Sequence, residues 1–372
     1  MKKTIIEAFG SIYDPRREHK KLYSLIEIIF LTISAVVSGA DHFTEIQQFG
    51  DNNLDWLRKF LPYKNGIPSH DCLGYFFTQI NPKEFKRCFA EWVKSMAKVT
   101  NGEIVAIDGK TLRRSYDSTN KKTAVHMVSA WANSANLVLA QVKTEEKSNE
   151  ITAIPELLKI LELNGCIVTI DAMGTQREIA KSIINAKADY VLALKGNQGT
   201  LHDDVIQFFE DALLKGFHEY AYETRTETNK DHGRYEVREY FLVTDISWLP
   251  QVAAWKGLSS VGMVKASITE NGNTTVMLRY YISSLTNNCG QFAHAVRFHW
   301  GIENSLHWCL DIGFREDESR VRNGDAPDNF AVIRHICLNL LKQEKTRKAG
   351  LKGKRLNAAW NSTYREKVLF GV

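Results

Sequence analysis

Two aspartates each end a short apolar run, and this repeated pattern is the first place where the sequence suggests chemistry. Asp108 follows the run 104–107, and Asp171 follows the run 167–170. Binding sites in open α/β sheets form at the carboxyl ends of strands, where both aspartates are expected. Carboxylates held close together repel one another, and a divalent cation with oxygen ligands, Mg²⁺ or Mn²⁺, relieves that repulsion. Either aspartate alone is better explained as a turn or capping residue. The occurrence of two aspartates, each directly after an apolar strand, is what favours a functional site.

A third acid is needed to hold two metal ions, and Glu303 is the best candidate. It lies in a helical run of apolar and aromatic residues, where a charged side chain is expected to be paired or functional. Its neighbours at four-residue spacing, His299 and His307, are expected to share its helix face. Two other interpretations stay open, a surface salt bridge and a helical transition-metal site. The pattern is not the H-E-x-x-H motif of metalloproteases.

The residues Asp108-Gly-Lys-Thr111 resemble the end of a phosphate-binding loop without completing one. The Walker A motif is G-x-x-x-x-G-K-[ST], with its first glycine five residues before the second. Here that position is Ile104, inside the apolar run. The sequence therefore argues against an NTPase.

Changes in the spacing of apolar residues outline the elements that must position these acids. Residues 1–100 repeat apolar residues every three or four positions, which predicts helices. From residue 103 the order is strand, strand, strand, helix, strand, helix, strand, helix, which predicts an α/β fold with a mixed sheet flanked by helices. The expected strands are 104–108, 126–132, 137–144, 167–171 and 190–194, and the expected helices are 154–163, 177–186 and 199–214.

A β-rich segment separates this sheet from the helix that carries Glu303. Strands are expected at 235–244, 261–269 and 275–283, inside an insertion at about 220–285. Long helices are expected at 289–311 and 326–345. The predicted domains are an N-terminal helical domain at 1–100, an α/β domain at 101–345 that includes the insertion, and a basic C-terminal tail at 346–372.

Charge is distributed unevenly along the chain. The net charge is +5, yet the segment 342–367 alone holds nine basic residues and two acidic ones. The rest of the chain is close to neutral, so the C-terminal end is predicted to be a phosphate-binding helix or arm, or a solubilising terminus. With 44% hydrophobic and 24% charged residues, the composition excludes wholesale disorder.

The cysteines and the apolar stretches predict a cytoplasmic protein that does not span a membrane. Six cysteines lie far apart with no C-x-x-C pair, as expected of free thiols in a reducing compartment. Residues 1–21 lack the apolar core of a signal peptide. The longest apolar stretch, 22–40, contains Glu27 and several Ser and Thr residues, which favours a buried helix.

Five short strings, taken in order, resemble bacterial insertion-sequence transposases of the DDE class, in particular the H-repeat-associated subgroup. They are IDGKTLR at 107–113, IDAMGTQ at 170–176, LKGNQ at 194–198, HGRYEVR at 232–238 and HWGIEN at 299–304. The resemblance runs over nearly the whole chain. It includes two N-terminal segments typical of the subgroup, RREHK at 16–20 and GIPSHD at 66–71. Each string alone is weak, whereas the ordered set is specific.

The resemblance implies an RNase H-like catalytic core with Asp108, Asp171 and Glu303 as the catalytic triad, binding two Mg²⁺ or Mn²⁺ ions. The implied activity is strand cleavage at the ends of an insertion element, followed by transfer of the 3′-hydroxyl ends into target DNA. The β-rich insertion then accounts for the long spacing between Asp171 and Glu303.

The segment around Glu303 departs from the pattern of many relatives. They carry Tyr seven residues before the glutamate, Arg four before and Lys seven after, where this chain has Val296, His299 and Leu310. Arg297 is a candidate substitute for the arginine, and the lysine has no counterpart at its position.

The resemblance also implies double-stranded DNA as the partner, both element ends and target. A homodimer is expected because two element ends must be brought together. The candidate DNA contacts are Arg113, Arg114, Lys195, Gln198, His232, Arg234, Arg238, Arg297 and His299. Two alternatives are an RNase H-like nuclease that cuts without joining, and a decayed copy that only binds DNA.

Overall fold

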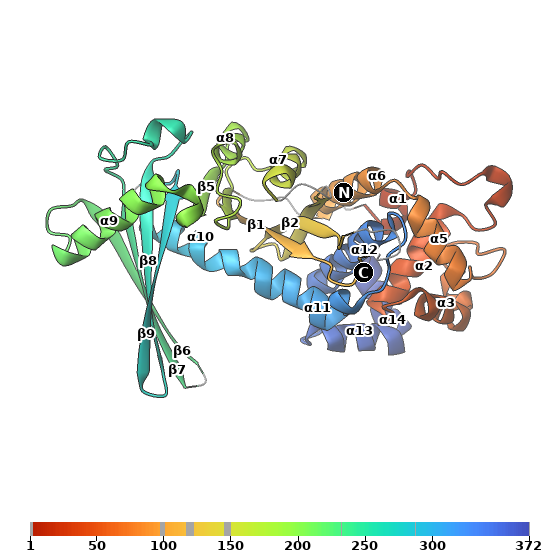
Figure 1. Cartoon of the computed structure of the whole chain (residues 1–372). Helices are drawn as coiled ribbons and strands as arrows, with labels where there is room; N and C mark the ends of the chain where they lie inside the picture. The colour runs from red at the N-terminus through yellow and green to blue at the C-terminus, as the bar shows by residue number, and fades with distance from the viewer. Residues whose placement is uncertain are drawn as a thin grey trace. The chain divides into compact units, whose positions relative to one another are not determined.

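The chain folds into two units, each assembled from stretches that lie far apart in the sequence (Figure 1). The computed structural model describes residues 3–96, 101–116, 123–144, 150–231, 233–286 and 288–371. Unit 1 comprises Met1–Lys98, Gly109–Ser148 and Glu303–Val372, and unit 2 comprises Val99–Asp108 and Asn149–Ile302. The domain boundaries placed at 100 and 345 do not coincide with these units and remain a prediction.

Unit 1 is mainly helical. Its N-terminal stretch forms α1 (Ile5–Phe9), η1 (Glu18–Lys20), α2 (Leu25–Val37), α3 (Phe43–Asn52), α4 (Leu54–Leu57), α5 (His70–Gln79) and α6 (Pro82–Met96). The helix α2 begins at a capping box, in which Ser24 Oγ accepts the Glu27 N–H and the Glu27 carboxylate accepts the Ser24 N–H. Nearly all of α2 is buried, so the expectation of a buried helix is confirmed. In the described part of the chain, no helix is both long and apolar enough to cross a membrane.

The helix α12 (Ala326–Gln343) is the centre of unit 1, packing against α2, α5 and α6 and against a hairpin of β2 (His126–Ala132) and β3 (Leu137–Lys143). Its buried polar residues bond to backbone groups of its neighbours. The Asn339 amide accepts from Val138 N and donates to Val138 O, both at 2.9 Å. Asn329 Nδ2 donates to two carbonyls at the end of α5, those of Phe77 and Ile80. These bonds satisfy groups that would otherwise be buried without partners.

The basic C-terminal segment folds into α13 (Leu351–Trp360) and α14 (Ser362–Phe370), which pack against α2 and α12. Two of its arginines are buried. Arg365 lies over the Trp56 ring at 4.0 Å, and Arg355 donates to backbone carbonyls, among them Val36 O at 3.0 Å. These two cations therefore stabilise unit 1 and are not part of a phosphate-binding arm.

Unit 2 is built on a mixed sheet in the strand order β1-β4-β5-β9-β8-β7-β6. The strands β1 (Ile104–Thr111), β4 (Ile167–Ile170) and β5 (Asp189–Leu194) are parallel. The helices α7 (Glu150–Ile160) and α8 (Arg177–Asn185) lie on one side of this part of the sheet, and α10 (Cys289–Ile302) runs along the other (Figure 1). All of β4 is buried, as expected for a parallel strand covered on both faces.

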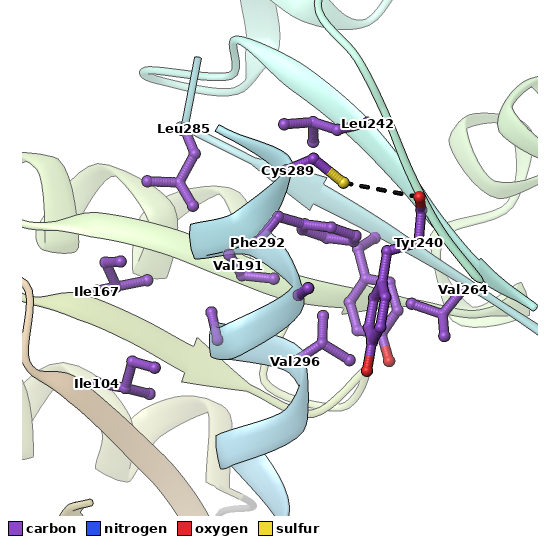
Figure 2. Close-up of a cluster of buried hydrophobic side chains, with 13 residues drawn as sticks. Ile104, Ile167, Val191, Tyr240, Leu242, Val264, Leu285, Cys289, Phe292 and Val296 are labelled. Atoms are coloured by element: carbon purple, nitrogen blue, oxygen red, sulfur yellow. Dashed lines mark hydrogen bonds between the residues drawn. The ribbon is translucent and has the colours of Figure 1, made fainter. Parts of the chain in front are cut away.

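The helix α10 is held on the sheet by a cluster of buried apolar side chains (Figure 2). Phe292 lies at its centre, and Ile104, Ile167 and Val191 supply one residue each from the three parallel strands. A Cβ on Gly262 would lie 2.3 Å from the Phe292 ring, so only glycine permits this close approach. Cys289 Sγ donates to the Tyr240 carbonyl at 3.6 Å (Figure 2).

The remaining strands of unit 2 form an antiparallel extension of the sheet, defined as β6 (Tyr222–Asp231), β7 (Arg234–Val243), β8 (Ser260–Glu270) and β9 (Asn273–Ser283). The extension projects past the helices of unit 2 (Figure 1). Three of its strands match the expectation for 220–285, whereas β6 was not expected. Its residues are exposed on both faces, so no apolar alternation announces a strand. Between β5 and β6 lies α9 (Thr200–Leu214), and η3 (Val252–Ala254) follows β7.

The long helix expected at 289–311 is interrupted. It consists of α10, a π-helical turn η4 (Glu303–His307) and α11 (Trp308–Phe314), with the turn η5 (Glu316–Glu318) after it. Single π-turns inside α-helices are frequent at functional sites. The turn begins at Glu303.

Candidate active site at the ends of the parallel strands

Asp108 and Asp171 are brought side by side by the register of β1 and β4. The two strands pair in parallel with Ile107 opposite Ile170, and each aspartate is the next residue. Neighbouring strands are about 4.8 Å apart, so the two carboxylates start from adjacent positions. Alternation along each strand places both side chains on the same face as Ile104 and Ile167, which is the face that α10 covers.

The loop after β4 fixes the carboxylate of Asp171. Oδ1 accepts the backbone N–H groups of Met173 and Gly174 at 3.0 and 3.1 Å. Among the described residues, every hydrogen bond that this side chain accepts uses Oδ1. Thr175 Oγ1 donates to the Ala193 carbonyl of β5 at 2.6 Å, which ties the loop to the next strand. A Cβ on Gly174 would lie 2.3 Å from Ile170 Cγ2, so the loop requires glycine there.

The loop after β5 carries two of the candidate DNA contacts, Lys195 and Gln198. Lys195 is exposed, and its extended backbone continues the strand beyond Ala193, a residue that packs on the α10 cluster. Alternation therefore places Lys195 on the same face as the two aspartates. Gln198 Nε2 donates to the Thr175 carbonyl at 2.6 Å, and Asn197 Nδ2 donates to the Ala172 carbonyl at 2.7 Å. The two loops are thus joined, and the Gln198 amide already has a structural partner.

His299 lies beside Asp171 within unit 2. Its Nδ1 is 3.0 Å from Thr169 Oγ1, and Thr169 precedes Asp171 by two residues on the same strand face. Burial lowers the pKa of His299 to about 4, although the Asp171 carboxylate acts in the opposite direction. The imidazole is therefore uncharged at neutral pH, and His299 supports the strand end rather than offering a cation to DNA.

Glu303 directly follows α10, one helical turn after His299. Its side chain is exposed, although its neighbours in the sequence are mostly apolar and aromatic. Because of the π-turn, four-residue spacing no longer places His307 where an α-helix would place it. His307 lies in unit 1, close enough to His335 to influence the pKa of His335. His299 belongs to unit 2, whereas Glu303 and His307 belong to unit 1. Among the residues that the structure describes, no three His, Cys, Asp or Glu side chains gather closely enough to hold a metal ion.

Arg113 and Arg114 lie in unit 1, just beyond β1, and both are exposed. Arg113 Nε is 3.1 Å from Asp317 Oδ2, so this candidate DNA contact already has an acidic partner. The Arg114 carbonyl accepts from Arg322 Nε at 2.9 Å. Both side chains remain on the surface.

Two further candidates, Arg234 and Arg238, lie on β7 and share one face of the antiparallel extension. That face is continuous with the face on which α10 packs, because Tyr240 belongs to the α10 cluster and alternation connects it to both arginines. Glu236 pairs with Arg238 at 2.6 Å and with Arg234 at 3.9 Å. Arg234 lies six residues along the strand from Tyr240, about 20 Å away. His232 lies outside the described residues.

The same face holds an arginine that the sequence analysis missed. Arg279 of β9 is exposed, pairs in register with Val264, and lies over the Trp300 ring of α10 at 5.0 Å. In the part of unit 2 that the structure describes, Arg279 has no ion pair with a carboxylate. Arg297, also exposed, is near enough to Tyr240 to influence its pKa. The sequence indicates only that Arg279 and Tyr281 share one face of a strand. That pattern does not distinguish an arginine that contacts DNA from one on an ordinary strand surface.

Comparisons with known proteins point to one family over most of the chain. A family model described as "Transposase DDE domain" matches residues 100–340, and one described as "DDE_Tnp_1-associated" matches residues 6–93. "Putative transposase YncI" of Escherichia coli O157:H7 is 42% identical over 373 residues, covering 98% of this chain and 94% of that protein. "H repeat-associated putative transposase YhhI" of Escherichia coli (strain K12) is 40% identical over 375 residues, covering 99% and 98%.

One solved structure also overlaps with the chain. It is a piggyBac transposase synaptic complex with hairpin DNA, with a TM-score of 0.42 and 14% sequence identity, covering 99% of this chain and 78% of that one. This overlap is too weak to establish a shared fold.

Proposed function

Because the chain belongs to the DDE transposase family, we propose that it cuts DNA at the ends of an insertion element and joins the freed 3′-hydroxyl ends to target DNA. The observation that carries the proposal is the parallel register of β1 and β4, which sets Asp108 beside Asp171. Glu303 is the third acid, on the helical stripe that runs through Val296 and His299 at intervals of three and four residues. The fold that we propose around these acids is RNase H-like.

The donor set fits divalent metal ions. Paired carboxylates are hard oxygen ligands, and the hydrogen bonds to Asp171 Oδ1 leave Oδ2 as the oxygen we assign to a metal. Asp108, Asp171 and Glu303 would together hold two Mg²⁺ or Mn²⁺ ions, which supply Lewis-acid catalysis of phosphodiester transfer. The backbone N–H groups of Met173 and Gly174 orient the Asp171 carboxylate before any ion binds.

DNA is proposed to lie along the face of unit 2 that carries the aspartates and the extension. The side chains of Lys195, Arg279 and Arg297 are exposed there and suit phosphate contacts, which position DNA without reading its sequence. We infer that two copies of the chain act together, because two element ends must be paired, and that they act in the cytoplasm.

Substituting the three acids tests the proposal. Asp108→Asn, Asp171→Asn and Glu303→Gln should each abolish Mg²⁺-dependent cleavage of DNA that carries the element ends, because each removes a charged metal ligand. Binding of the same DNA should stay close to that of the wild type. Asp189→Asn, which alters an aspartate at the opposite end of β5, is the matched control and should cleave normally. Full cleavage by any of the three variants would remove that residue from the site.

A second candidate function is DNA binding without catalysis. It is favoured by Leu310, which occupies the position where many relatives carry lysine and is buried in α11. The wild-type chain would then bind element ends and fail to cut them in Mg²⁺ or Mn²⁺. A strand-transfer assay with pre-cut ends separates both candidates from a nuclease that cuts without joining.

A further inference from the structure

Lys110 is the centre of a buried charge network in unit 1 that the proposed chemistry does not use. Its ammonium contacts Asp311, lies 2.9 Å from Glu316 Oε2 and lies 3.4 Å from Asp317 Oδ1. The Lys110 side chain is 12% exposed and that of Glu316 is 2% exposed. Three carboxylates from one segment, 311–317, therefore converge on one lysine of β1.

The network is balanced in charge only when Lys110 is present. Glu316 Oε1 is also 3.6 Å from Arg334 Nη1, and Asp317 is paired with Arg113. Three acids thus face three permanent cations, namely Lys110, Arg334 and Arg113. Long side chains are rarely buried as ions unless they are fully paired, so this arrangement is a built feature and not a chance surface contact.

The two ends of the network follow the two outer acids of the proposed triad. Lys110 is two residues after Asp108 on the same strand, so both side chains point to the same face. Asp311 is eight residues after Glu303, on the helix that continues from the π-turn. Both partners of this contact belong to unit 1, which β1 enters at Gly109 and which the long helix enters at Glu303.

We propose that Lys110 is a positioning residue, which anchors β1 just beyond Asp108 to the helical segment just beyond Glu303. The inference rests on the function proposed above. Catalytic groups must be held within a fraction of an ångström, and a displacement of about 1 Å can reduce a rate about 100-fold. A covalent chain alone does not fix a strand end to a helix, whereas three ionic contacts to one buried ammonium do.

The test is a double substitution that removes the tether and keeps the charge balance. Lys110→Met with Asp311→Asn leaves Glu316 and Asp317 paired with Arg334 and Arg113. This variant should melt near the wild-type temperature and bind element-end DNA normally, while its cleavage rate falls about 100-fold. The matched control is Lys86→Met with Asp328→Asn, because Lys86 is equally buried and pairs with Asp328 at 2.6 Å elsewhere in unit 1. The control should cleave like the wild type.

Two results would overturn the proposal. One is cleavage by the Lys110 double variant within about threefold of the wild type. The other is an equal loss of cleavage in the Lys86 control, which would show that any buried pair in unit 1 has the same effect.

Amide hydrogen exchange tests the anchoring role of Lys110 independently of catalysis. Amides 107–112 should exchange faster in the Lys110 double variant than in the wild type, and no faster in the Lys86 control. If the wild-type chain does not cleave at all, the proposed function fails. The exchange measurement alone then tests whether Lys110 anchors β1 to the helical segment after Glu303. Unchanged exchange at 107–112 would then disprove it.

Discussion

The orientation of a single side chain, that of Asp171, depends on the backbone that surrounds it. Its Oδ1 is held by two N–H groups of its own loop, and that loop is joined to the next by Thr175, Asn197 and Gln198. The carboxylate is therefore oriented by bonds that a substitution elsewhere in the loop can disturb.

Gly174 is the residue where this dependence can be measured. Gly174→Ala would place a Cβ 2.3 Å from Ile170 Cγ2 and 2.8 Å from Ile154 Cδ1, in a packed core. We expect the free energy of unfolding to fall by about 1–3 kcal/mol, because the strand must shift to relieve the overlap. Urea denaturation measures the change. Gly196→Ala is the control, since a Cβ added there would meet nothing within 4 Å. Equal stability of the two variants would contradict the conclusion that the loop requires glycine at position 174.

At this scale the sequence located Asp108 and Asp171 because a strand end is visible as an apolar run that stops at an acid. It did not reveal that the Gln198 amide bonds to Thr175, since a glutamine in a loop has no pattern that names its partner. It did not reveal that Glu303 is exposed, because apolar neighbours in the sequence do not settle which side of a helix is covered. Arg279 was missed because the sequence does not distinguish an arginine that contacts DNA from any other arginine on a strand.

Among the elements, the π-turn at Glu303–His307 has the clearest consequence. It inserts the equivalent of one extra residue between α10 and α11. The buried face of α10 packs on the sheet of unit 2, whereas Leu306 and Leu310 are buried beyond the turn. A regular α-helix would rotate these two stretches relative to one another.

Deleting Asn304, an exposed residue of the π-turn, should therefore destabilise the protein. The deletion shortens the turn to regular α-helical length, so Leu306 and Leu310 leave their buried positions. We expect the melting temperature to fall by at least about 5 °C and cleavage to be lost. Thermal unfolding followed by circular dichroism measures the first effect. Asn304→Ala keeps the length of the turn and should have the melting temperature of the wild type. A deletion variant with that same melting temperature would argue against a structural role for the turn.

The elements that the sequence predicted well have a clear apolar pattern. The parallel strands are apolar on both faces, and α10 has one apolar face. The strand β6 was missed because both of its faces are polar, with Thr224, Thr226 and Thr228 on one and Glu223, Arg225 and Glu227 on the other. A helix in the basic C-terminal segment was one of the alternatives, but the packing of α13 and α14 was not predicted, because a dense row of basic residues suggests a solvated segment. Arg365 is instead buried against Trp56 and Phe49. Cation–π contacts of this kind depend on residues about 300 positions away in the sequence.

For the whole molecule, buried histidines make stability depend on pH. Burial lowers the pKa of His335 to about 4, well below its ordinary value. The charged or titratable groups that face it are Glu316, His307, Lys110 and Arg334. Between about pH 6.5 and 4 the unfolded chain binds more protons than the native one, so stability is lost as the pH falls through this window, by about 3 kcal/mol at most.

His335→Leu should flatten that dependence, because the group that titrates only after unfolding is gone. Chemical denaturation at pH 7 and pH 5 measures the slope in both proteins. Part of the slope should remain in the variant, since the pKa of His299 is also lowered to about 4. An unchanged slope in His335→Leu would mean that the pKa of His335 is the same in the native and unfolded states, contrary to the lowered value.

Association with DNA is the second property of the whole molecule that the charges predict. Arg279→Gln should weaken binding of element-end DNA and reduce the dependence of log K on log salt by about one unit, because one phosphate contact is lost. Arg225→Gln is the comparison, since Arg225 is already paired with Glu227 at 3.0 Å and should change the slope less. Filter binding over a range of salt concentrations gives both slopes. Equal slopes for wild type and Arg279→Gln would exclude this contact.

The discontinuity of unit 1 has a consequence for how the protein is made. The helices α2 and α6 leave the ribosome early, but α12, which covers them, begins about 230 residues after α6 ends. At ordinary rates of translation these apolar surfaces wait on the order of ten to fifty seconds for their partner. A nascent chain that stops just before α12 keeps Glu303, yet it exposes the N-terminal helices with no core to join. We expect such prematurely terminated copies to be removed by proteolysis or aggregation before they could occupy DNA.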